Sequence, residues 1–105
     1  MKTLVSVPHH DYPASVRDSV EAKLQSLAKY FERIESLRAV LGRENDSHRV
    51  ELVAHVGQGA TLVVDEHAAT LDEAVDGALQ RMRGVLTRHK QRLVQRNRRP
   101  KSDES

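Results

Sequence analysis

The cations in the last quarter of the chain are the residues with the clearest chemical potential. From Arg81 to Lys101, nine side chains are Lys or Arg and none is Asp or Glu. Residues 1–80 carry 8 basic and 13 acidic side chains, whereas residues 81–105 carry 9 basic and 2 acidic ones. A concentrated positive field attracts polyanions, and Lys and Arg neutralise nucleic-acid phosphates. The pattern therefore predicts a surface that binds a phosphate backbone.

A purely structural explanation covers only part of this basic run. Lys and Arg near the C-terminus of a helix complement the helix dipole, and many proteins use them in this way. That explains cations in the last turn, but not cations spread over about six turns with no acid among them. The run therefore favours ligand binding over helix stabilisation alone.

The other reactive residue types form no recognisable catalytic or metal site. Asp65, Glu66 and His67 are adjacent, but no nucleophile or oxyanion site accompanies them. The six His residues lack the spacing of metal ligands, and the chain has no Cys. Gly57–Gly59 precedes no expected helix, unlike a phosphate-binding loop. We expect no enzyme, no metal, no cofactor and no small-molecule substrate.

Composition narrows the class of partner. With one Phe, two Tyr and no Trp, the chain offers little for stacking unpaired bases, so backbone and shape recognition of structured RNA is expected. Its 105 residues suit one domain, and no apolar run approaches the roughly 18 residues that cross a bilayer. We therefore expect a soluble cytoplasmic protein, a monomer when free, with no membrane partner.

Hydrophobic periodicity predicts the elements that position these cations. Residues 3–7 form an expected first strand, and apolar steps of three and four predict a helix from about Pro13 to Phe31. Residues 36–44 and 48–56 are expected strands because apolar and polar side chains alternate. After a turn at Gly57–Gly59, residues 60–68 form an expected fourth strand that alternates less cleanly. The order β-α-β-β-β-α predicts an α+β two-layer sandwich, with both helices on one face of a four-stranded sheet.

A second helix carries most of the cations. Thr70 and Glu73 have capping-box spacing, and the apolar stripe continues far enough to place the helix end near Gln95. We expect a folded domain of residues 1–95 and a disordered basic tail of residues 96–105, because Pro100 cannot continue a helix.

The cations of this helix flank its apolar stripe. At about 100° per residue, one edge holds Arg81, Arg88 and Arg92, and the opposite edge holds Arg83 and Lys90. Both rows can join cations of the first helix in a groove. His89 lies near the centre of the apolar sector, so we expect it to pack against the core with a polar tip at the domain edge.

The element order and several stretches resemble a known family. VRDSVEAKLQSLAKYF and the run Arg88-His89-Lys90 resemble the short ribosome hibernation-promoting factors, a translation-inhibitor family also called sigma-54 modulation or S30EA proteins. The resemblance covers about residues 2–94. It implies a fold similar to double-stranded RNA-binding domains, and a stress or stationary-phase role in ribosome hibernation. The protein would occupy the mRNA and tRNA channel of the small ribosomal subunit and block translation.

The resemblance also implies which residues contact 16S ribosomal RNA. The matching positions are Lys23, Lys29, Arg81, Arg83, Arg88, His89, Lys90 and Arg92. A transcription-modulating protein that binds DNA or a sigma factor is the first alternative, because one family label suggests it. A protein-binding adaptor that uses an acidic outer sheet face is the second. A basic helix on a membrane surface is a weaker third, since the apolar stripe is needed for the core.

Overall fold

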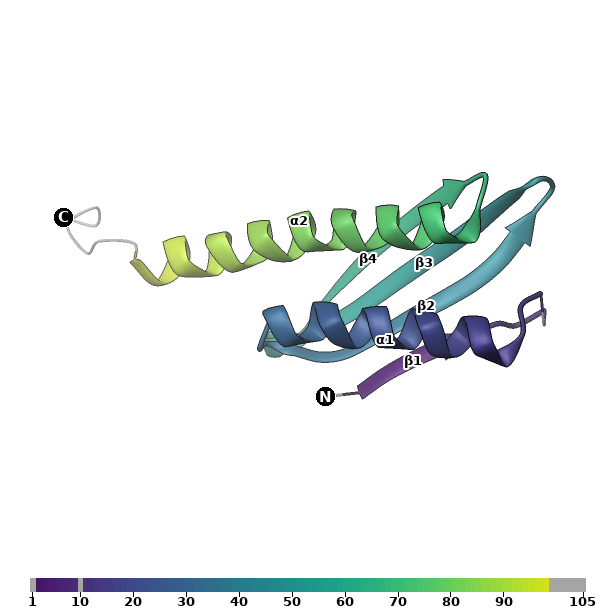
Figure 1. Cartoon of the computed structure of the whole chain (residues 1–105). Helices are drawn as coiled ribbons and strands as arrows, with labels where there is room; N and C mark the ends of the chain where they lie inside the picture. Colours follow the sequence, from purple (N-terminus) through teal and green to yellow (C-terminus); the bar gives the residue numbers. More distant parts are fainter. Residues whose placement is uncertain (1, 10, 99–105) are drawn as a thin grey trace.

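The fold is a four-stranded sheet with two helices packed on one face (Figure 1). The computed structural model describes residues 2–9 and 11–98. In chain order the elements are β1 (Lys2–Ser6), α1 (Ala14–Tyr30), β2 (Ile34–Glu44), β3 (Ser47–Val56), a 3₁₀ turn (Gly57–Gly59), β4 (Ala60–Ala68) and α2 (Leu71–Arg98). The predicted α+β class and element order are confirmed.

The strands lie in the order β1-β2-β3-β4, which matches their order in the chain. β1 runs parallel to β2, while β3 is antiparallel to both of its neighbours. β2 begins at Ile34, two residues before the expected start, and a bulge lies between Ile34 and Ser36. Only Asn45 and Asp46 connect β2 to β3, and Asn45 has a φ of 57°, which Asn tolerates better than most residues.

Strand alternation builds the core as predicted. Leu37, Ala39 and Leu41 of β2 are fully buried beneath the helices. So are the inward residues of β3, which are Val50, Leu52, Ala54 and Val56. The helices close this layer with their apolar stripes, chiefly Val20, Leu24, Leu27, Ala74, Val75, Ala78, Met82 and Leu86. The same stripe that covers the sheet therefore fixes the direction in which the cations of α2 point.

The ends of α1 differ slightly from expectation. We expected Pro13 as the first helical residue, but the helix begins at Ala14 and Pro13 is its cap. The Pro13 carbonyl accepts hydrogen bonds from the N–H groups of Val16 and Arg17, at 3.1 and 3.3 Å. Proline serves either position because it has no N–H to leave unpaired.

The predicted pair, Thr70 and Glu73, closes the start of α2, but the Glu73 carboxylate accepts from the Thr70 hydroxyl and not from its backbone N–H. The Glu73 N–H donates to Thr70 Oγ1 at 3.2 Å, and the Thr70 hydroxyl donates to Glu73 Oε1 at 2.9 Å. The helix continues to Arg98, three residues beyond the expected end at Gln95, and its C-terminal part extends past the sheet (Figure 1). Residues 99–105 of the expected tail lie outside the described residues. No helix in the described part of the chain is both long and apolar enough to span a bilayer.

Candidate nucleic-acid interface

One predicted basic row of α2 faces α1. The Arg83 guanidinium carbon lies 5.3 Å from the ring centre of Tyr30, the last residue of α1. A cation over an aromatic face at this distance is attracted to the ring. Lys90, on the same edge of α2, lines a hollow together with Lys29 of α1. The expected junction between this row and the first helix is therefore present.

The hollow lies between the C-terminal end of α1, the following loop and α2. Its apolar lining comes from Phe31, Ile34, Val56, Leu86 and Leu93. Its polar lining comes from Lys29, Tyr30, Glu32, Arg33, His89 and Lys90. A concave apolar surface bordered by several cations and one acid is suited to a ligand that has both a flat apolar part and a negative charge.

The packing of His89 differs in part from the expectation. Its side chain is half-buried and lines the hollow, as its place in the apolar sector suggested. The expected polar tip at the domain edge is wrong for Nε2, which is covered and has no hydrogen-bond partner among the described residues. A buried polar atom without a partner costs about 1–3 kcal/mol, so this nitrogen is a local cost to the packing of the helix.

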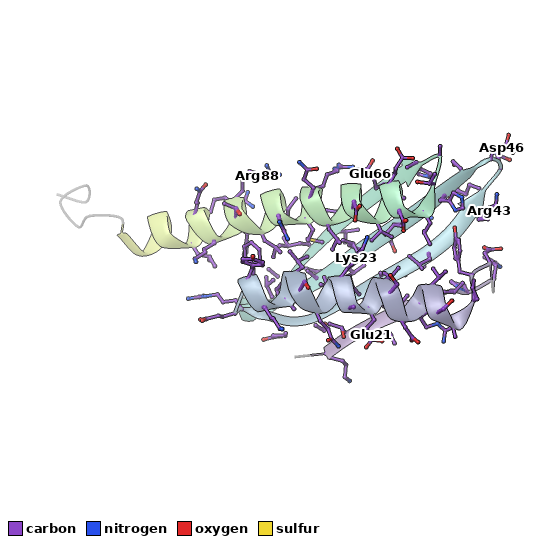
Figure 2. All side chains as sticks on the ribbon, in the orientation of Figure 1. Glu21, Lys23, Arg43, Asp46, Glu66 and Arg88 are labelled. Carbon is purple, nitrogen blue, oxygen red and sulfur yellow. The ribbon has the colours of Figure 1, made fainter. Side chains whose placement is uncertain are left out.

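The other basic row faces β4 and is partly neutralised. Arg81 Nη1 donates to the Asp65 carbonyl oxygen at 2.8 Å and lies 3.6 Å from Glu66 Oε2. Arg81 can reach the Asp65 carbonyl because β4 is an edge strand whose outer carbonyls lack a strand partner. Arg88 and Arg92 continue this row and are exposed, and neither forms an ion pair within the described residues. Figure 2 shows Arg88 on the side of α2 that is turned away from α1, so the expectation that both rows join the first helix is wrong for this row.

Lys23 is also compensated. Its ammonium group donates to Asp76 Oδ1 at 2.9 Å, which joins α1 to α2 across the surface. The partners are 53 residues apart in sequence, so only the folded chain brings them together. Of the eight predicted RNA-binding residues, Lys23 and Arg81 are therefore partly occupied by acids of the protein itself.

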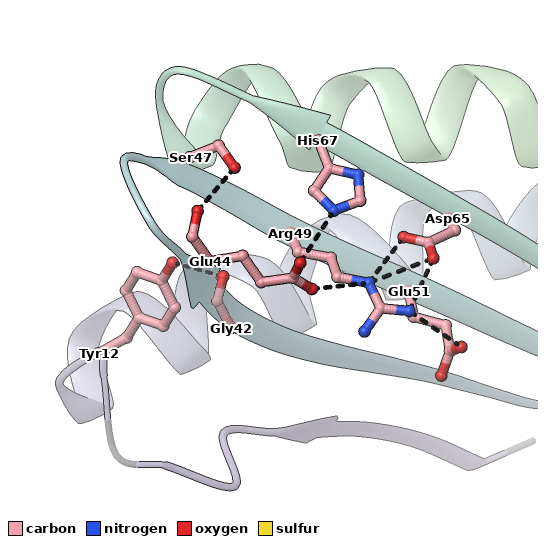
Figure 3. Close-up of polar contacts among 8 residues, drawn as sticks. All are labelled: Tyr12, Gly42, Glu44, Ser47, Arg49, Glu51, Asp65 and His67. Atoms are coloured by element: carbon pink, nitrogen blue, oxygen red, sulfur yellow. Dashed lines mark hydrogen bonds and ion pairs between the residues drawn. The ribbon is translucent and has the colours of Figure 1, made fainter.

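The opposite face of the sheet carries a different kind of charge cluster, drawn in Figure 3. Arg49 of β3 binds the Asp65 carboxylate of β4 through two nitrogens, with Nη2–Oδ2 at 2.7 Å and Nε–Oδ1 at 3.0 Å. Glu44 and Glu51 lie 3.6 and 3.9 Å from the same guanidinium, and His67 Nε2 lies 3.8 Å from Glu44. This arginine is surrounded by three carboxylates.

The pKa values of this pair follow from its geometry. The hydrogen bonds from Arg49 lower the pKa of the Asp65 carboxyl below its usual value, and the same contacts raise the pKa of Arg49.

Burial raises the pKa of the Tyr12 hydroxyl, which lies 2.6 Å from His48 Nδ1 and 3.2 Å from the Gly42 carbonyl oxygen. These groups hold the sheet and the loop before α1 together. Across the described ranges, no three His, Cys, Asp or Glu side chains gather as a metal site would require.

Comparison with known proteins settles the family. The profile of the family described as "Sigma 54 modulation protein / S30EA ribosomal protein" matches residues 4–94. The chain belongs to this family. A relative from Escherichia coli K12, named ribosome hibernation promoting factor, is 31% identical over 81 residues, covering 77% of this chain and 84% of the relative. Another of that name, from Azotobacter vinelandii, is 27% identical over 96 residues, covering 91% of this chain and 89% of the relative.

Solved structures share the architecture. A ribosomal subunit interface protein from Coxiella burnetii superposes with a TM-score of 0.76 at 14% identity, covering 86% of this chain and 98% of that one. The N-terminal domain of Protein Y from Thermus thermophilus gives a TM-score of 0.69 at 26% identity, covering 83% and 94%. The family resemblance and the fold inferred from sequence are both confirmed.

Proposed function

We propose that this protein binds the small ribosomal subunit and inhibits translation in the manner of a hibernation factor. The observation that carries this proposal is a set of exposed cations on α2 and the end of α1 with no acidic partner within the described residues. These are Lys29, Arg83, Arg88, Lys90 and Arg92. The names of its relatives, ribosome hibernation promoting factors, support the ribosome as the partner.

The proposed mechanism is steric. The free cations contact phosphates of 16S ribosomal RNA, and each contact releases counterions from the RNA. The apolar core holds both helices on the sheet, so the backbone positions from which the cations project are fixed before binding. Once seated, the sandwich occupies the channel that mRNA and tRNA require. No bond is made or broken in this process, and no catalytic group is needed.

The test is a competition for isolated small subunits. We expect the protein to co-sediment with small subunits in sucrose gradients and to reduce the binding of initiator tRNA and mRNA as its concentration rises. Duplex DNA in gel-shift assays serves as the second arm, because one family label refers to a sigma factor. Subunits that bind tRNA normally in the presence of the protein would contradict the proposal. Tighter binding to duplex DNA than to subunits would favour the transcriptional alternative.

A further inference from the structure

We propose that the hollow between the end of α1 and α2 holds one unpaired nucleotide of an RNA strand, with its base against Tyr30 and its phosphate among the surrounding cations. This inference rests on the proposed function, because it assigns one part of the basic surface a more specific role. Sequence composition argued against base stacking, yet two of the three aromatic residues, the chain neighbours Tyr30 and Phe31, line this hollow.

Aromatic placement is the first support. The chain has three aromatic side chains, and Tyr30 and Phe31 both line this hollow. Tyr30 is 72% exposed, although exposing an apolar ring to water is unfavourable. Arg83 lies over the ring and restrains it from one side. An exposed, positioned aromatic ring beside cations is the arrangement on which unpaired bases stack.

The excess of positive charge around the hollow is the second observation that supports a nucleotide site. Lys29, Arg33 and Lys90 line the hollow with their cationic side chains, and Arg83 stands beside it on Tyr30. Glu32 is the acid within the lining, so the balance at this position remains positive. A base with its phosphate fits this balance. A neutral apolar ligand would leave the cations without a partner.

The floor of the hollow is the third support. Phe31, Leu86 and Leu93 give it an apolar surface that can cover one part of a base. His89 lines the same hollow, although its Nε2 is covered by the protein itself. Paired RNA cannot place a base on this surface, because its bases are stacked on one another within the helix.

The experiment compares two short RNA hairpins that differ at one position. One carries a single bulged 2-aminopurine, and the other is fully paired. We expect the wild-type protein to bind the bulged hairpin roughly tenfold more tightly and to quench its fluorescence, as stacking on an aromatic side chain does. Tyr30→Ala should bring the ratio of the two affinities close to one, whereas Tyr30→Phe should preserve it.

A matched control lies on the far face of the sheet. Val63 is also a large exposed apolar residue, at 55%, and Val63→Ala should leave the ratio unchanged. Equal affinity of the wild type for both hairpins would overturn the inference, as would a ratio that survives Tyr30→Ala. Competition by free adenosine monophosphate as strong as that by the bulged hairpin would also overturn it, in favour of a mononucleotide site.

This inference and the proposed function can fail separately. Wild-type protein that binds small subunits but shows no preference for the bulge would refute the nucleotide site alone. Preference for the bulge without any association with small subunits would refute the ribosomal proposal and leave the site standing.

Discussion

The two faces of the molecule use the same kinds of charged residue for different ends. On the open face of the sheet, Arg49 lies among Glu44, Glu51 and Asp65, and its charge is compensated within the fold. On the helix face, Arg83 and Lys90 are exposed and have no acidic partner among the described residues. Compensated charges help to hold a structure together, whereas uncompensated ones remain available to a ligand. Arg49 therefore serves the fold, whereas Arg83 and Lys90 remain available to a ligand.

Charge reversal on the helix face should have the largest effect. Arg88→Glu combined with Lys90→Glu should weaken binding to small subunits by at least about a hundredfold, since two charge-assisted contacts are lost and repulsion replaces them. Thermal unfolding should change little, because both side chains are exposed. Co-sedimentation and circular dichroism measure the two quantities.

The sheet face supplies the matched control for this reversal. Lys2→Glu with Arg38→Glu changes the net charge equally, and both residues are exposed on β1 and β2. Binding should fall only slightly, through the weaker overall field. If both double variants lost binding to the same extent, net charge rather than the helix surface would be responsible.

The salt dependence of binding should report how many cations of the helix face are engaged. If the five free cations each neutralise one phosphate, the logarithm of affinity should fall against the logarithm of salt concentration with a slope of about −3.5 to −4.5. The variant with both Arg88 and Lys90 reversed should give a slope shallower by about 1.5. Filter binding over a salt series is the measurement, and a flat response would contradict the electrostatic account.

Removing the acidic partner of a cation on the helix face should make that face more positive and increase its contrast with the sheet face. Asp76→Asn removes the partner of Lys23, whose ammonium group then becomes available to phosphate. We expect affinity for small subunits to rise about two- to threefold, with a loss of stability below about 1 kcal/mol because the pair is exposed. Weaker binding would show that the pair positions the surface rather than masking it.

Disrupting the sheet-face cluster should affect folding and leave binding alone. Arg49→Ala should lower the free energy of unfolding only slightly, since the pair is partly exposed. The pKa of Asp65 is lower in the folded chain than in the unfolded one, so this stabilisation is present at neutral pH and is lost as pH falls through the folded pKa. Urea unfolding at neutral and acidic pH should show the difference between wild type and variant shrinking on acidification. A difference independent of pH would exclude the ion pair as its cause.

Much of the fold followed from local patterns. Alternation in β2 and β3 identified the buried residues, because a strand with one covered face must alternate. Thr70 and Glu73 identified the start of α2, since the bonds that close a helix end are made between neighbours in sequence. The angular positions of Arg81 and Arg83 on opposite edges of α2 followed from the helical repeat alone.

The compensation of particular cations could not be read from the sequence. Lys23 meets Asp76 across 53 residues, and Arg81 meets the exposed edge of β4, so both contacts depend on how the layers pack. The approach of Arg83 to Tyr30 depends on the same packing. Sequence reasoning therefore found the set of candidate cations but could not divide it into paired and free members. The predicted contacts with 16S ribosomal RNA remain predictions.

The capped start of α2 has a consequence for how this chain can vary in length. One helix supplies both the residues that cover the sheet and those that face a ligand, and its first turn is anchored at Thr70. An insertion of a single residue between Thr70 and Arg83 would rotate everything after it by about 100°. Either Met82 and Leu86 would leave the core, or the cations would turn away from α1. Length changes are therefore tolerable in the connections between elements and excluded from this stretch of the helix.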